Sequence, residues 1–199
     1  GSALQALREG NVDALISNEI IVRSYNALRP YIALEIAGTS ALPPTGYAFA
    51  SRAADTRLHQ LLDQALASID ESLRREILGR WTTGLGSDIA QNRIELAPAE
   101  QAWVKDHRQV RVTASQYSPY LYQDRQGQSV GLNSEVLATI SRMTGLQFTY
   151  LPTRSIAQGL DILRRGDADM STTLSETVER KAFLNFSHSF GGQGWVFIV

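Results

Sequence analysis

The stretch "LRRGDADMSTTLSETVERKAFLNFSHSF", residues 163–190, carries the signals that decide the fold of this chain. It opens with the end of a helix that Gly166 stops, because glycine readily adopts the left-handed conformation found just beyond a helix. "ADMSTT", residues 168–173, follows as a buried strand. Hydroxyl side chains and an arginine then gather over residues 172–180, at the end of that strand. This corner is a candidate ligand site, because ligands of open α/β sheets bind outside the carboxyl ends of the strands.

Upstream of this stretch, strands alternate with helices in the pattern of a parallel sheet. The predicted elements, in chain order, are a short helix from Pro98, a strand over 109–115, a helix over 134–145 capped by Asn133 or Ser134, a strand over 146–152 and a helix over 155–166. Elements of these lengths in this order argue for parallel strands joined by right-handed crossovers. The predicted fold class is therefore α/β.

The N-terminal part of the chain ends in the strongest helical pattern of the sequence. Strands are predicted over 13–17, 31–38 and 46–52, and one long helix runs from an N-cap at Asp55 to Trp81. Large apolar side chains recur along this helix at spacings of three or four residues: Leu58, Leu62, Leu66, Ile69, Leu73 and Ile77. Each is worth about 1.5 to 3 kcal/mol when fully buried, so some surface must cover the stripe. We expect residues 46–52 and this helix to complete the sheet of residues 110–199, within one molecule or by swapping with a neighbour.

Composition excludes several classes of protein. Lys and Arg number 19 and Asp and Glu 20, mixed along the chain with no basic block, so nucleic acid is not an expected partner. No apolar run approaches the roughly 20 residues that cross a bilayer, and we expect any export signal or membrane span to lie outside this chain. The chain has no cysteine, which excludes disulfides and thiolate chemistry, and its three histidines are too scattered in sequence to suggest a metal site.

Residues 96–190, taken together, resemble the first lobe of a periplasmic solute-binding, or Venus flytrap, domain. The matching features are the strand "VRVTAS", Pro119 and Tyr120 in the loop after it, Gly127 and Gly131 before the first helix, the segment "LRRGDADM", and Thr177, Arg180, Leu184, Phe186, Ser187 and Phe190. The resemblance implies a periplasmic-binding-protein-like α/β fold, with a mixed and mainly parallel sheet flanked by helices.

The resemblance also implies a division of the chain. Residues 3–85 are similar to the C-terminal part of one flytrap domain, 86–97 to a linker, and 98–199 to the N-terminal lobe of a second. This order is similar to the tandem periplasmic sensor domains of BvgS- and EvgS-type hybrid sensor histidine kinases. In that family a Leu-x-x-x-Glu-x-x-Trp segment precedes each repeat, and Glu100 and Trp103 match it here.

The residues that hold the ligand are implied by the same resemblance. In amino-acid-binding members the arginine of this motif pairs with a ligand carboxylate, whose geometry matches the guanidinium fork. The positions carried over are Arg180 for the carboxylate, Ser175 for a hydroxyl, Thr173 for a backbone contact, Thr177 as helix cap, Tyr117 and Tyr120 as an apolar wall, and Ser115, where many members place an aspartate for the ligand's ammonium group. No catalytic residue, metal ligand or cofactor is implied.

The residues alone leave alternatives open at this corner. Arg180 sits within one helical turn of Glu176 and Glu179, and a solvated pair with either carboxylate explains an arginine there equally well. The tyrosines are also explained as packing residues with one wet end.

The resemblance predicts a periplasmic, ligand-sensing region of an inner-membrane histidine kinase, which binds a small carboxylate or amino-acid-like solute and transmits lobe closure. The expected partners are that solute, a neighbouring flytrap domain, and a second copy through dimerisation or swapping. The alternatives are a solute-binding protein of an ABC transporter and an enzyme built on the flytrap fold. Neither paired carboxylates near a histidine nor a nucleophile motif supports the enzyme.

Overall fold

The computed structural model describes residues 3–28, 34–43, 46–82, 94–190 and 194–198. Its helices are α1 (Ala3–Arg8), α2 (Glu19–Leu28), α3 (Thr56–Ala67), α4 (Glu71–Thr82), α5 (Pro98–Asp106), α6 (Leu132–Thr144), α7 (Ile156–Arg165) and α8 (Val178–Lys181). Its strands are β1 (Leu15–Asn18), β2 (Ile36–Thr39), β3 (Ala48–Arg52), β4 (Gln109–Ser115), β5 (Tyr122–Gln123), β6 (Ser129–Val130), β7 (Gln147–Thr153), β8 (Met170–Leu174), β9 (Leu184–Phe186) and β10 (Trp195–Ile198).

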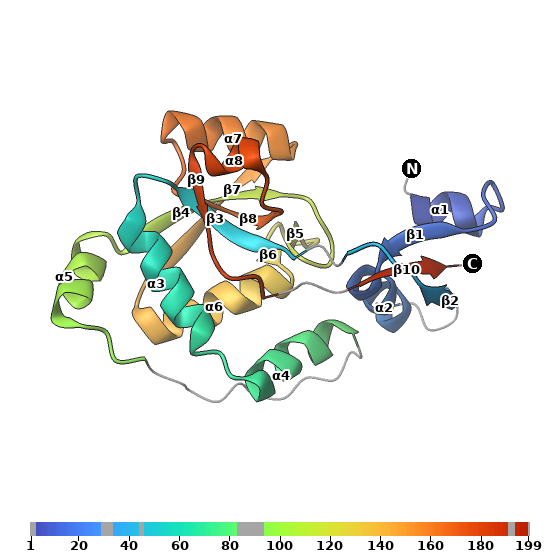
Figure 1. The fold of residues 1–199 in the computed structure, drawn as a ribbon, viewed down its shortest axis with the longest axis horizontal. Helices are drawn as coiled ribbons and strands as arrows, with labels where there is room; N and C mark the ends of the chain where they lie inside the picture. Colours follow the sequence, from blue (N-terminus) through green and yellow to red (C-terminus); the bar gives the residue numbers. More distant parts are fainter. Residues whose placement is uncertain (1–2, 29–33, 44–45, 83–93, 191–193, 199) are drawn as a thin grey trace.

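A five-stranded sheet in the order β7-β4-β8-β3-β9 forms the centre of the larger of two units (Figure 1). β4 pairs in parallel with β7 and β8, whereas β3 pairs antiparallel with β8 and β9. Helices α3 and α6 cover one face of the sheet and α7 covers the other (Figure 1). The predicted α/β fold with a mixed sheet flanked by helices is confirmed, although antiparallel pairings are as numerous in this sheet as parallel ones.

Strand β3 brings the N-terminal part of the chain into this sheet. All six residues of the predicted apolar stripe are buried, at 7% exposure or less. They share one core with Val110 and Val112 of β4 and Met170 of β8. The prediction that residues 46–52 and the following helix complete the sheet of residues 110–199 is therefore confirmed, here within a single chain.

The single helix predicted over 55–81 is wrong, because the structure has two helices that break at residues 68–70. Ser68 donates its hydroxyl to the carbonyl of Gln64, and Asp70 Oδ1 accepts from the backbone N–H of Leu73 at 2.8 Å. Asp70 thus caps a new helix, the role that aspartate fills well. Asp55 does stand at the N-cap of α3, but its carboxylate binds Arg52 instead of the helix backbone.

Helix α6 begins at Leu132 after Gly131, so the predicted caps Asn133 and Ser134 are wrong. Gly131 has φ 128°, and a Cβ there would lie 2.5 Å from the carbonyl oxygen of Tyr120. Glycine is therefore required by the close approach of the 119–120 backbone. Asn133 falls inside the helix, where its side chain is free to reach the sheet.

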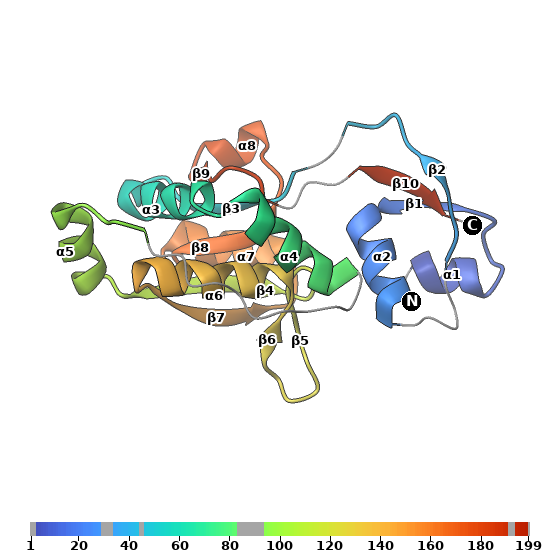
Figure 2. The ribbon, with the colours of Figure 1, turned by 90° about the horizontal axis from the view of Figure 1, so that it is seen from below.

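The smaller unit is built on a three-stranded sheet in the order β1-β10-β2, with α1 and α2 beside it (Figure 2). The C-terminal strand β10 lies antiparallel between β1 and β2. The chain therefore passes between the two units twice, after β2 and after β9. Across the described ranges, no helix has the length and apolar character needed to traverse a bilayer. Most of the predicted linker, 86–97, lies outside the described residues.

Candidate functional site

Hydroxyl side chains gather where the parallel strands β4 and β8 end. Thr113 of β4 is in register with Ser171 of β8, so Ser115 and Thr173 each lie two residues further toward the same edge. Ser175 follows directly after β8. Ser115 and Ser175 are partly exposed, whereas Thr173 is buried. Three of the predicted site residues thus lie on the strand ends where ligands of α/β sheets bind.

Arg180 reaches back to this edge from helix α8. Thr177 caps that helix by accepting from the backbone N–H of Arg180, as the sequence predicts. The guanidinium Nη1 of Arg180 then donates to the carbonyl oxygen of Ser175 at 2.7 Å. These two contacts hold the half-buried Arg180 beside Ser175. The guanidinium of Arg180 has further N–H donors besides the one that binds Ser175.

The alternative partners of Arg180 are engaged elsewhere or too far away. Glu176 pairs with Lys181 at 2.5 Å. Within the described part of the chain Arg180 forms no ion pair with a carboxylate. The pKa of Glu179 is lowered mainly by the backbone N–H at the start of α8 and by Thr177, and only last by the charge of Arg180. Among the described residues the guanidinium of Arg180 is therefore left without a direct ion pair.

The two predicted wall residues have different surroundings. Tyr120 is fully buried, and its hydroxyl donates to Asn18 Oδ1 of the smaller unit at 3.0 Å. Tyr117 is partly exposed, stacks on Tyr120 and shares a 2.9 Å hydroxyl contact with Tyr47. Burial raises the pKa of both Tyr47 and Tyr120 well above the ordinary value. In this structure Tyr120 is a core residue that joins the two units, and Tyr117 is the one with accessible surface.

A buried asparagine that the sequence analysis had assigned as a helix cap also belongs to this edge. Asn133 of α6 is 0% exposed and its Nδ2 donates to Thr173 Oγ1 at 2.5 Å. Thr173 itself has φ 60°, a left-handed conformation that is a genuine outlier for a β-branched residue. Nothing in the local sequence signals this contact, because the two residues are 40 positions apart.

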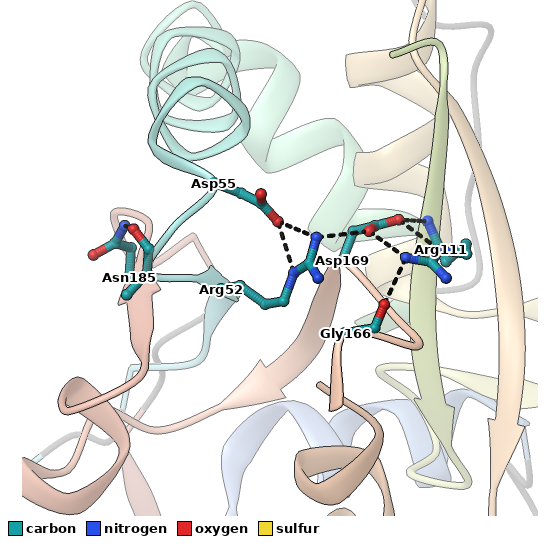
Figure 3. Close-up of polar contacts among 7 residues, drawn as sticks. Arg52, Asp55, Arg111, Gly166, Asp169 and Asn185 are labelled. Atoms are coloured by element: carbon teal, nitrogen blue, oxygen red, sulfur yellow. Dashed lines mark hydrogen bonds and ion pairs between the residues drawn. The ribbon is translucent and has the colours of Figure 1, made fainter. Parts of the chain in front are cut away.

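The opposite end of the same sheet carries a network of four paired charges (Figure 3). Asp169 binds both Nε and Nη2 of Arg111, at 3.0 and 2.8 Å, and accepts from the Arg111 backbone N–H. Arg52 joins Asp169 at 3.3 Å and Asp55 at 2.8 Å. A cavity of about 370 Å³ opens beside the network. The carboxylates of Asp55 and Asp169 that line it are already paired, so we assign this end a structural role.

The structure also brings two of the scattered histidines to one carboxylate. His59 Nε2 lies 3.6 Å and His188 Nδ1 3.3 Å from oxygens of Asp63. In the described ranges, no group of three or more histidine, aspartate or glutamate side chains has a geometry that could hold a metal ion.

Comparison with known proteins finds one family model and several sensor proteins that are similar to this chain. Residues 110–199, just under half of the chain, match the family model of bacterial extracellular solute-binding proteins, family 3. Over 99% of its length the chain is 28% identical to the virulence sensor protein BvgS of Bordetella pertussis and 23% identical to the sensor protein EvgS of Escherichia coli K12. The chain spans 16% of each of these relatives.

Solved structures include similar chains. The crystal structure of the B. pertussis BvgS periplasmic domain is 31% identical to this chain, covering 68% of it and 27% of that domain, with a TM-score of 0.48. An ancestral cationic amino acid solute-binding protein is 23% identical over 41% of this chain and 36% of its own, with a TM-score of 0.37.

Proposed function

Because residues 110–199 match family 3 of the solute-binding proteins and the whole chain is homologous to the BvgS and EvgS sensor proteins, we propose that this chain is the solute-binding part of a periplasmic sensor. We assign residues 98–199 to the first lobe of one flytrap domain and residues 3–85 to the last part of the domain before it, joined through 86–97. In this chain strand β3 of the first segment completes the sheet of the second, and β10 of the second segment lies between β1 and β2. The homology to sensor proteins along 99% of the chain supports this order.

The ligand is a small solute that carries a carboxylate, and Arg180 is its anchor. The observation that carries this proposal is the single 2.7 Å contact of Arg180 with a backbone carbonyl, in the absence of an ion pair among the described residues. A guanidinium held in this way keeps a fork of parallel donors for a planar carboxylate. We assign Ser175, Ser115 and Tyr117 as the residues whose hydroxyls contact the rest of the solute.

Binding acts on the rest of the protein through the relation of one lobe to the other. A ligand shifts such an equilibrium only by its preference for the closed state. We therefore propose that the signal passes through the two segments that connect the units, after β2 and after β9, and then, beyond this chain, to a membrane-spanning histidine kinase.

Titration of the isotopically labelled chain with acetate, the simplest carboxylate, tests the anchor. We expect the backbone amide of Ser175 and the side-chain resonances of Arg180 to shift in a saturable way with acetate and to remain unchanged with neutral acetamide. Arg180→Ala should abolish the response, because the charged partner is lost. The matched control is Arg108→Ala, which removes an exposed arginine at the other end of β4. Equal responses of the two variants would refute Arg180 as the anchor.

A further inference from the structure

Strand β8 contains a bulge where it meets β3. Ala50 pairs with Ser171 and Ala48 with Leu174, so Thr172 and Thr173 together face the single residue Phe49. Thr173 adopts φ 60° at this bulge, and no other non-glycine residue in the described ranges has a positive φ. A β-branched side chain in that region is strained and persists only where its surroundings enforce it.

Asn133 of α6 contacts the side chain of Thr173. Its Nδ2 donates to Thr173 Oγ1, and Thr173 Oγ1 in turn lies 3.4 Å from Thr172 Oγ1. Asn133 is itself fixed, since its backbone N–H donates to the carbonyl of Tyr120 at 2.7 Å. Gly131, just before α6, packs closely against the same backbone.

The side chain of Asn133 has a second unfavourable feature, an unpaired oxygen. Asn133 Oδ1 is buried and has no hydrogen-bond partner in the described part of the chain. Buried polar atoms are nearly always paired, and leaving one unpaired is destabilising. A strained threonine and an unpaired amide oxygen therefore meet at one point, at the strand end that leads into the candidate site. Such coincidences are typical of sites where geometry is held for function.

We infer that Asn133 is a positioning residue for solute binding: by holding Thr173 left-handed, it directs the Leu174–Ser175 backbone so that the Ser175 carbonyl meets Arg180. This inference rests on the proposed function. Asn133 does not itself touch the solute. Its effect passes along the chain from Thr173 to Ser175, whose carbonyl receives Arg180 Nη1 at 2.7 Å.

The test uses variants that remove the contact from either side. Asn133→Ala removes the donor, and Thr173→Val keeps the branched shape of the side chain but removes the acceptor. In the double variant Asn133→Ala/Thr173→Gly, glycine takes the left-handed conformation without strain, so Asn133 is no longer needed there. Asn185→Ala is the matched control, because it removes another side-chain donor, to the carbonyl of Ala53, away from the end of β8.

Two readouts need no ligand and a third uses acetate. A strong intraresidue amide-to-α-proton NOE reports the left-handed conformation at position 173, and slow exchange of the Arg180 guanidinium protons reports the contact with Ser175. We expect Asn133→Ala and Thr173→Val to lose both signals and to bind acetate about tenfold more weakly, the equivalent of one hydrogen bond to a buried group. The double variant should recover the slow exchange of the Arg180 guanidinium protons and most of the affinity.

Retention of both signals in Asn133→Ala would overturn the inference, as would a double variant no better than the single one. If Asn133→Ala does not fold, Thr173→Val and the double variant decide the question in the same way. If the unmodified chain does not bind acetate, the proposed function fails, while the two ligand-free signals still establish whether Asn133 sets the geometry of Arg180.

Discussion

The two ends of the five-stranded sheet use arginine in opposite ways. At the end where β8 begins, the guanidinium of Arg111 donates hydrogen bonds to both carboxylate oxygens of Asp169 and to the carbonyl of Gly166 (Figure 3). At the end where β8 finishes, the guanidinium of Arg180 donates one hydrogen bond among the described residues, to the carbonyl of Ser175, two positions after the strained Thr173. At the first end the charged side chains are paired within the fold. At the second end the charge of Arg180 has no ion-pair partner among the described residues.

The difference is the one we expect between a structural arginine and a ligand-binding arginine. Asp169 lies between two arginines that come from β3 and β4, 117 and 58 residues away in sequence, so its network fastens distant parts of the chain to β8. The side chain of Arg180 is bound only to the carbonyl of Ser175, five residues earlier in the chain. Its removal would therefore leave no carboxylate without its ion-pair partner. We therefore expect that replacing charged residues of the Asp169 network lowers the stability of the fold, and that replacing Arg180 lowers solute binding.

Replacing Asp169 should have the largest effect on stability. Asp169→Ala leaves two guanidiniums and a backbone N–H without their acceptor, and we expect a loss of roughly 2 to 4 kcal/mol in the free energy of unfolding, measured with urea. The control is Asp167→Ala, two residues away, whose carboxylate pairs with Arg165 in solvent at 3.0 Å. That exposed pair should be worth less than about 1 kcal/mol. Similar losses in both variants would mean that the network does not hold β8.

Acid should weaken the same network by a smaller amount. Burial alone raises the pKa of Asp169, but the hydrogen bonds of Arg111 and the charges of Arg111 and Arg52 outweigh it and hold the pKa below its ordinary value. For a depressed pKa, the stabilisation is present above the unfolded value of about 4 and is lost as the pH falls toward the folded value.

The difference in unfolding free energy between the unmodified chain and Asp169→Asn should therefore shrink as the pH is lowered from about 5 to about 2. Urea titrations of both proteins over this range measure it. A difference that stays constant with pH would show that Asp169 contributes through packing rather than through its charge.

Much of the fold follows from local signals in the sequence. The glycine stops and the alternation of strands and helices are properties of neighbouring residues, and the structure shows them where they are predicted. The Thr177 cap, which the resemblance implies, is also present. The insertion of β3 follows from an energetic argument, since an apolar stripe as long as that of residues 58–77 needs a sheet to cover it. The break at Asp70 was missed because the apolar spacing continues through it and masks a good capping residue.

The site is less accessible from sequence. Arg180 and Ser175 lie within one short motif and could be named together. Asn133 and Thr173, Tyr120 and Asn18, and Asp63 and His188 are contacts between residues at least 40 positions apart, and they depend on how helices pack on the sheet. Single-sequence patterns carry no record of such pairs. The strain at Thr173 is likewise invisible, because threonine is otherwise an ordinary strand residue.

The most direct test of the central claim is the effect of acetate on stability in three proteins: the unmodified chain, Arg111→Ala and Arg180→Ala. Each is unfolded with urea in saturating acetate and in chloride of the same ionic strength, since a ligand that binds the folded state raises the unfolding free energy. We expect Arg111→Ala to be destabilised yet to keep the acetate increment, and Arg180→Ala to be within about 0.5 kcal/mol of the unmodified chain in chloride and to lose the increment. An increment that survives in Arg180→Ala, or disappears in Arg111→Ala, would contradict the division of roles between the two ends of the sheet.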